Sequence, residues 1–123
     1  MAYLNDRVFD EGLSVLDLEA NAVHVTSSEA TDYTEATSTY TLGSSSSLSI
    51  DAPADRTGGG RKVSVTAIAD GAITGTGTVT HYALVDTVNS RLLATAALTA
   101  SQSVTNGNTF TLATFDIGIP DPS

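Results

Sequence analysis

Cysteine and tryptophan are absent from the 123-residue chain, and basic residues are scarce, with five against 14 acidic ones. Without cysteine, neither disulfide bridges nor thiolate metal sites can hold the fold together. No stretch approaches the roughly 20 consecutive apolar residues that span a bilayer as a helix. The N-terminus also lacks the basic segment followed by an apolar run that marks a signal peptide. We therefore expect neither a membrane span nor a secretory leader.

The scarcity of bases gives the chain a formal net charge of −9. Such a field repels the phosphates of nucleic acids and the head groups of anionic membranes, so we expect neither as a partner. Charged residues make up only 15% of the chain, and Ser and Thr take their place. A composition rich in Thr, Ser, Val and Ala favours strands over helices. At this length we expect one hydrophobic core.

Alternation of apolar and polar residues with a period of two dominates the region between residues 61 and 119. Val, Thr, Ile, Phe and Tyr in this pattern are typical of strands on a half-buried sheet. We predict four strands here, at residues 62–69, 77–86, 91–100 and 109–119.

Turn residues and shorter patterns predict the remaining elements. Residues 22–26 and 47–50 alternate as strands, and residues 43–47 predict a flexible turn. Ser28 or Thr31 can cap a short helical turn that has Glu35 near its start. Three tight connections are expected: a hairpin loop at 86–90, a turn at Asp70-Gly71, and a hairpin at Asn106-Gly107 that pairs residues 103–105 with 108–110.

Together these elements predict an all-β fold, an antiparallel β-sandwich or barrel of about six to eight strands. The β domain spans residues 21–119. Residues 1–20 form a short N-terminal arm, helical or extended, and residues 120–123 form an extended C-terminal tail because proline removes the donors that a ladder needs.

Two candidate partner-binding surfaces stand out. The arm carries more apolar surface than a terminal segment needs, and Gly12 interrupts it, so it docks either on its own sheet or on a neighbouring protein. The second surface is a basic cluster beside the glycines at 58–60, which we interpret as a flexible loop, with contact between its bases and an acidic partner as the alternative. The candidate residues are Tyr3, Leu4, Val8, Phe9 and Leu13 in the arm, and Arg56, Arg61 and Lys62 in the cluster.

No residue pattern predicts catalysis, a metal site or a cofactor. His24 and His81 each lie in the middle of a predicted strand, no Ser occupies a nucleophile elbow, and the histidines lack ligand spacing. The acids at 10–11 and 17–19 are better explained as a solvated surface than as the carboxylate pair of a glycosidase. The scattered aromatics leave a sugar-stacking platform open as an alternative to core and interface roles: Tyr33, Tyr40, Tyr82 and Phe110.

Three segments resemble small structural proteins of tailed bacteriophages. They are DRVFDEGLSVLDLEA at residues 6–20, TYTLG at 39–43 and THYALVDTVNSRLLATAALTASQSVTNGNTFTLATFDIGIP at 80–120. The resemblance is to short, cysteine-free, Thr- and Ala-rich β proteins of the virion, and it concerns sequence texture rather than a catalytic motif.

The resemblance implies a non-enzymatic capsid decoration (cement) protein, which binds outside the assembled head and braces neighbouring subunits of the major capsid protein. It implies synthesis in the host cytoplasm, a final location on the virion surface, and self-association, with a trimer as one form. No functional residue and no cofactor follow from it, because such proteins act through surfaces. The alternatives are a structural protein of the neck or tail, a carbohydrate-binding β-sandwich module, and a small hydrolase.

Overall fold

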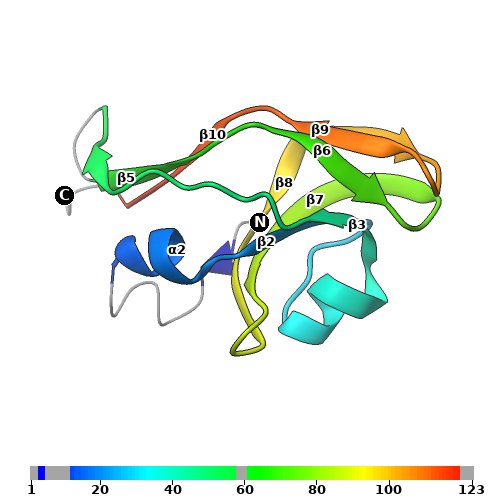
Figure 1. Cartoon of the computed structure of the whole chain (residues 1–123), viewed down its shortest axis with the longest axis horizontal. Helices are drawn as coiled ribbons and strands as arrows, with labels where there is room; N and C mark the ends of the chain where they lie inside the picture. Colours follow the sequence, from blue (N-terminus) through cyan, green and yellow to red (C-terminus); the bar gives the residue numbers. More distant parts are fainter. Residues whose placement is uncertain (1–2, 5–11, 58–60, 120–123) are drawn as a thin grey trace.

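The computed structural model describes residues 3–4, 12–57 and 61–119, and their strands form two antiparallel sheets (Figure 1). The larger sheet has seven strands in the order β1-β8-β7-β2-β3-β6-β9, and the smaller has three in the order β10-β5-β4. The prediction of an all-β antiparallel fold is confirmed. The strands are β1 (Tyr3–Leu4), β2 (Ala22–Thr26), β3 (Thr41–Ser45), β4 (Ala54–Asp55), β5 (Arg61–Val65), β6 (Ile68–Ile73), β7 (Gly77–Asp86), β8 (Arg91–Val104), β9 (Thr109–Leu112) and β10 (Phe115–Ile119); the helices are α2 (Ser14–Glu19) and the π-helix η1 (Glu35–Thr39).

Two of the long strands predicted from the sequence are broken and pass from one sheet to the other. The strand predicted at 62–69 is β5 in the small sheet followed by β6 in the large one, and the strand predicted at 109–119 is β9 followed by β10. The two breaks lie side by side, because Val65 faces Phe115 before them and Ile68 faces Leu112 after them. Between these pairs the amide of Ala67 donates to Thr114 Oγ1 at 3.1 Å.

Burial changes phase at the first of these breaks. Val63 and Val65 are buried in β5, as alternation from residue 63 predicts. Ala67, which continues the same alternation, is exposed, whereas Ile68 is buried. A bend that moves the chain into another sheet also changes which face of the strand meets the core, so a single continuous strand was the wrong interpretation.

Glycines lie inside strands at two sites where turns were predicted. The predicted turn at 43–47 is mostly strand β3, and the strand predicted at 47–50 is replaced by irregular chain with one bridge, between Ile50 and Val65. Gly43 lies in β3 where a Cβ would stand 2.4 Å from the carbonyl oxygen of Ala72. Asp70-Gly71 lies within β6, not in a turn. In both places glycine allows close approach to a neighbour rather than a tight turn.

The Asn106-Gly107 turn is present, but the strands on either side of it do not pair. Gly107 has φ +93° and Asn108 donates to the carbonyl of Thr105 at 3.0 Å, as in a tight turn. However, β9 pairs with β6, and β8 pairs with β7 and β1. The predicted ladder between 103–105 and 108–110 is therefore wrong, and the large sheet stays open between β8 and β9.

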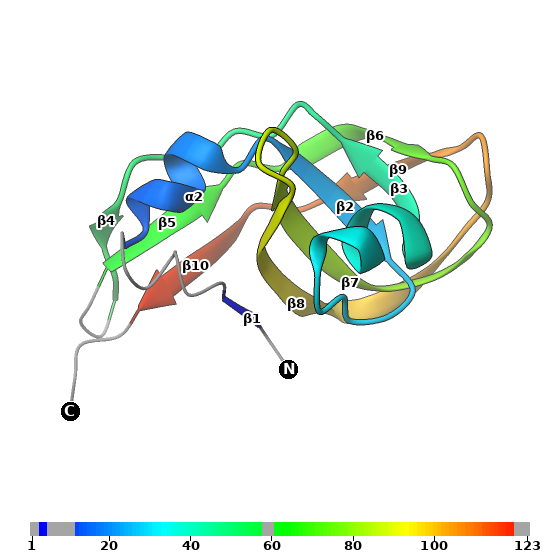
Figure 2. The ribbon, with the colours of Figure 1, turned by 90° about the horizontal axis from the view of Figure 1, so that it is seen from below.

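The main core lies within the curled large sheet and continues under the small one. It includes Val23 and Val25 of β2, Leu84 of β7 and Leu93 of β8, each almost fully buried. Helix α2 adds Val15 and Leu16 to the same cluster, and Figures 1 and 2 both show it beside β5.

A second, smaller apolar cluster covers the opposite face of the large sheet. Ala30 and Ala36, from the segment around η1, pack there with Ala83, Val85 and Leu92 from β7 and β8. Figure 2 shows η1 over β2 and β7.

The cap of the helical segment differs from both sequence candidates. Asp32 Oδ1 accepts from the amide of Glu35 at 2.8 Å, while Glu35 Oε1 accepts from the amide and hydroxyl of Thr31 at 2.8 and 2.7 Å. This reciprocal arrangement satisfies donors at the start of the helix.

Candidate binding surfaces

The predicted arm residues have different locations. Tyr3 and Leu4 form β1, which pairs with Thr95 and Ala94 of β8. Leu13 is buried in the chain's own core with 5% of its surface exposed, so its side chain is not available to a partner. Val8 and Phe9 lie outside the described residues, as does the tail at 120–123.

The predicted basic cluster gathers at the end formed by β4, β5 and β10. Arg56 and Lys62 line a shallow hollow of about 400 Å³ with Thr57, Asp116 and Gly118. Arg61 donates to the carbonyl oxygen of Pro53 at 3.2 Å. Two of the three predicted bases, Arg56 and Lys62, therefore share one hollow, and Arg61 is not among its lining residues.

An acidic residue of β10 partly neutralises this cluster. Asp116 Oδ1 accepts from Ser64 Oγ at 2.7 Å, and Asp116 Oδ2 accepts from Lys62 Nζ at 3.1 Å. These hydrogen bonds, from Ser64 first and then Lys62, lower the pKa of the Asp116 carboxyl. The pair is solvent-exposed, so it contributes little to stability, and the hollow is only weakly positive.

The two histidines each pair with a threonine hydroxyl in the large sheet. His24 Nδ1 lies 2.8 Å from Thr41 Oγ1, and burial lowers the pKa of its ring. His81 Nδ1 lies 2.8 Å from Thr80 Oγ1. Across residues 3–4, 12–57 and 61–119, no three His, Cys, Asp or Glu side chains gather in a way that could hold a metal ion.

The four aromatics considered as a sugar platform do not share one face. Tyr33 and Tyr40 pack against the small apolar cluster around η1, and Phe110 is buried in the main core. Tyr82 stands apart from them, its ring in tilted contact with Phe115 at a centroid distance of 4.4 Å. The platform of four is therefore wrong.

Two large apolar side chains are exposed at the junction of α2 with the β7–β8 turn. Leu18 is 80% exposed and Val88 81% exposed. Hydrogen bonds join the two segments that carry these residues. Asn21, just after α2, donates to the Thr87 hydroxyl at 2.9 Å and accepts from the Thr87 amide at 3.0 Å. An ion pair between Arg91 and Glu19, 3.4 Å long, joins the same two elements.

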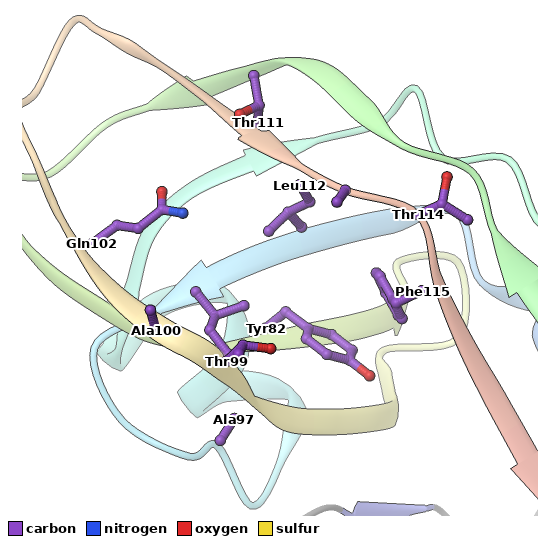
Figure 3. A pocket seen from close by; sticks show the side chains of 11 residues that line it. Tyr82, Ala97, Thr99, Ala100, Gln102, Thr111, Leu112, Thr114 and Phe115 are labelled. Carbon is purple, nitrogen blue, oxygen red and sulfur yellow. The ribbon is translucent and has the colours of Figure 1, made fainter.

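A groove of about 340 Å³ separates β8 from β9 and β10 (Figure 3). Tyr82, Leu112 and Phe115 point into it, and Gln102 reaches in from β8. Burial raises the pKa of the Tyr82 hydroxyl to about 12, so it is a neutral donor at physiological pH. The residues that line the groove are Tyr82, Ala97, Leu98, Thr99, Ala100, Gln102, Thr111, Leu112, Ala113, Thr114 and Phe115.

Sequence reasoning did not identify this groove. It forms because β8 bulges: Val79 pairs with Gln102 and His81 with Ala97, so the four residues from Leu98 to Ser101 lie opposite Thr80 alone. A bulge bends a strand and redirects its side chains. The weak sequence signal is the length of the alternating run from 91 to 104, which exceeds the partner strand.

The comparisons with known proteins add no relative: no family model, curated protein or solved structure matches the chain. In the part of the chain that the structure describes, no helix is long and apolar enough to cross a membrane.

Proposed function

We propose that this protein is a non-enzymatic structural protein of a tailed-bacteriophage virion, a capsid decoration protein that braces neighbouring major capsid subunits. The sequence supports this proposal through the three segments that resemble phage structural proteins, at residues 6–20, 39–43 and 80–120. The proposal assigns the protein to the outer surface of the head.

The structural observation that carries the proposal is the exposed apolar pair Leu18 and Val88. Single exposed apolar residues are common on soluble proteins. Here, however, two such residues lie on elements that are tied together by Asn21–Thr87 hydrogen bonds and the Glu19–Arg91 ion pair. A rigid apolar contact loses little entropy on binding, which suits a protein that attaches to a preassembled surface.

The junction also lies at the end of the predicted arm, residues 1–20, because it includes Leu18 and Glu19 of α2. We expect the junction and the arm to bind the same partner. The net charge of −9 keeps the protein soluble and limits adhesion to the packaged genome. Self-association, as a trimer, would let one assembly contact several capsid subunits.

The test is co-sedimentation of the purified chain with purified expanded heads, with free capsid subunits as the comparison. We expect saturable binding to heads, none to free subunits, and at least about tenfold weaker binding for the double variant Leu18→Asp/Val88→Asp. The matched control is Ser46→Asp/Thr105→Asp, which adds the same charge at exposed positions elsewhere. Equal binding by both variants would remove the junction from the contact surface.

Binding to isolated tails or necks, but not to heads, would instead identify a neck or tail protein. Saturable affinity for oligosaccharides without binding to any virion part would favour the carbohydrate-binding alternative. Analytical ultracentrifugation of the free chain reports its oligomeric state in the same preparation.

A further inference from the structure

The large sheet is an unclosed barrel whose two end strands face each other across the groove. In the strand order, β9 is the last strand at one end, and β8 is followed only by the two-residue β1 at the other. β1 occupies the edge of β8 at Ala94 and Thr95, just before β8 enters the groove. Beyond Thr95, that edge of β8 pairs with no strand among the described residues.

The free edge of β9 presents main-chain groups to the groove. Ile73 donates to the carbonyl of Asn108 at 2.9 Å, so Asn108, the residue just before β9, directs its C=O group toward β6. Successive residues of a strand direct these groups to opposite sides. Thr109 and Thr111 therefore direct their N–H and C=O groups away from β6, and Thr111 lines the groove. Unpaired edges of this kind are templates for an added strand.

The groove carries no charged side chain, although the chain as a whole has a net charge of −9. Its lining consists of apolar, threonine and glutamine side chains and the neutral Tyr82. The Tyr82 hydroxyl points along the groove in Figure 3, where it can bond to an incoming polar group. Burying an unpaired charge here would be costly, so the surface selects an uncharged occupant.

We propose that this groove binds an extended, uncharged segment of the major capsid protein, which adds a strand along the free edge of β9. The inference rests on the proposed function for the identity of the partner. β1 shows that the neighbouring edge of β8 already accepts an extended segment. Main-chain hydrogen bonds would supply affinity, and the pocket formed by Tyr82, Leu98 and Phe115 would select an uncharged side chain.

A saccharide fits this groove less well than a peptide. Sugar rings stack on an open aromatic face, but one side of Tyr82 is already packed against Phe115 at 4.4 Å. The main-chain groups at Thr109 and Thr111 repeat along a line, which matches a polypeptide backbone rather than a sugar ring.

Four variants of the full chain test the proposal by co-sedimentation with purified expanded heads. Thr111→Pro removes an outward N–H, whereas Thr111→Val keeps that N–H and removes the hydroxyl. Ala100→Asp places a charge in the groove, whereas Ala72→Asp makes the same change at an exposed strand alanine outside it. Circular dichroism checks the fold of each, and Ala100→Asp decides the matter if Thr111→Pro does not fold.

We expect at least about tenfold weaker head binding for Thr111→Pro and Ala100→Asp, and unchanged binding for Thr111→Val and Ala72→Asp. Amide hydrogen exchange of the unmodified chain should slow at Thr109 and Thr111 when heads are added. Head binding that is unchanged in all four variants would overturn the groove while leaving the decoration role in place. No binding by the unmodified chain would overturn both. Oligosaccharide binding that Ala100→Asp abolishes would overturn the peptide as occupant.

Discussion

At the scale of the residue, Gly71 shows how packing replaces turn chemistry. An Asp-Gly pair is a strong turn signal, yet Gly71 lies in β6 opposite Phe110. The Phe110 ring lies over the glycine so closely that a Cβ there would stand 2.2 Å from the ring atoms Cε1 and Cζ. The ring is itself buried, with 4% exposed. Glycine is therefore required at residue 71 by an aromatic side chain from a distant part of the sequence.

We predict that Gly71→Ala lowers the free energy of unfolding by about 1–3 kcal/mol, the usual cost of overpacking a core. The matched control is Gly75→Ala, whose Cβ would approach Leu42 Cδ2 at an ordinary 3.4 Å. Urea unfolding followed by circular dichroism measures both. Equal stability of the two variants would show that Phe110 moves aside without cost.

At the scale of the element, the turn between β7 and β8 depends on a buried carboxylate. Asp86, with 2% of its surface exposed, accepts from the amides of Val88 and Asn89 at 3.0 and 3.3 Å and from Asn89 Nδ2 at 2.8 Å. Burial acts to raise the pKa of this carboxyl, but the hydrogen bonds from Asn89 and Val88 and the charge of Arg91 outweigh it. The pKa of Asp86 is therefore lowered from its ordinary 3.8.

Because the folded-state pKa is depressed, the stabilisation is fully present above the ordinary value of 3.8 and is lost as the pH falls through the folded-state pKa. We predict that Asp86→Ala lowers the free energy of unfolding by about 1–3 kcal/mol at pH 7. The difference from the unmodified chain should shrink below about pH 4. Urea titrations at pH 7 and pH 3 measure it, with Asp51→Ala as a control for loss of a surface acid. A difference independent of pH would contradict the role of the charge.

Local pattern identified the strands of this protein well where neighbours in sequence are also neighbours in the sheet. The strand predicted at 77–86 is β7 with the same bounds, and the hairpin loop at 86–90 joins it to β8 as expected. The strands at 62–69 and 109–119 were each predicted as one continuous strand. The breaks at Ala67 and Thr114 are stabilised by a hydrogen bond between these two segments, which are distant in sequence, so neither segment alone reveals its break. Alternation indicates only which face of a strand each residue lies on. The one available signal of the break was therefore the large apolar Ile68, which falls on the face opposite to Val63 and Val65.

At the scale of the whole molecule, the candidate surfaces depend on strand order, which alternation does not contain. The shared hollow of Arg56 and Lys62 was predictable because these two bases are close in sequence. The groove between β8 and β9 was not predictable from the sequence. It exists only because these two strands do not pair, although a strong Asn-Gly turn connects them. The division of the N-terminal segment also depends on packing: Val15 and Leu16 face the core and Leu18 faces solvent on the same helix.

This division of the N-terminal segment leads to a prediction about where the arm ends. Leu13, Val15 and Leu16 are each at most 5% exposed, so they belong to the domain. Removing residues 1–11 should leave a cooperatively folding β domain that binds expanded heads at least about tenfold more weakly, because arm contacts are lost.

Removing residues 1–16 should abolish folding, since losing one buried leucine to alanine already costs about 2–5 kcal/mol and typical domains have only about 5–15 kcal/mol of stability. Thermal unfolding by circular dichroism and co-sedimentation with heads measure the two properties separately. Full head binding by the shorter truncation would remove the arm from the contact surface. Failure of that truncation to fold would instead show that residues 1–11, which include β1, stabilise the sheet through the edge of β8.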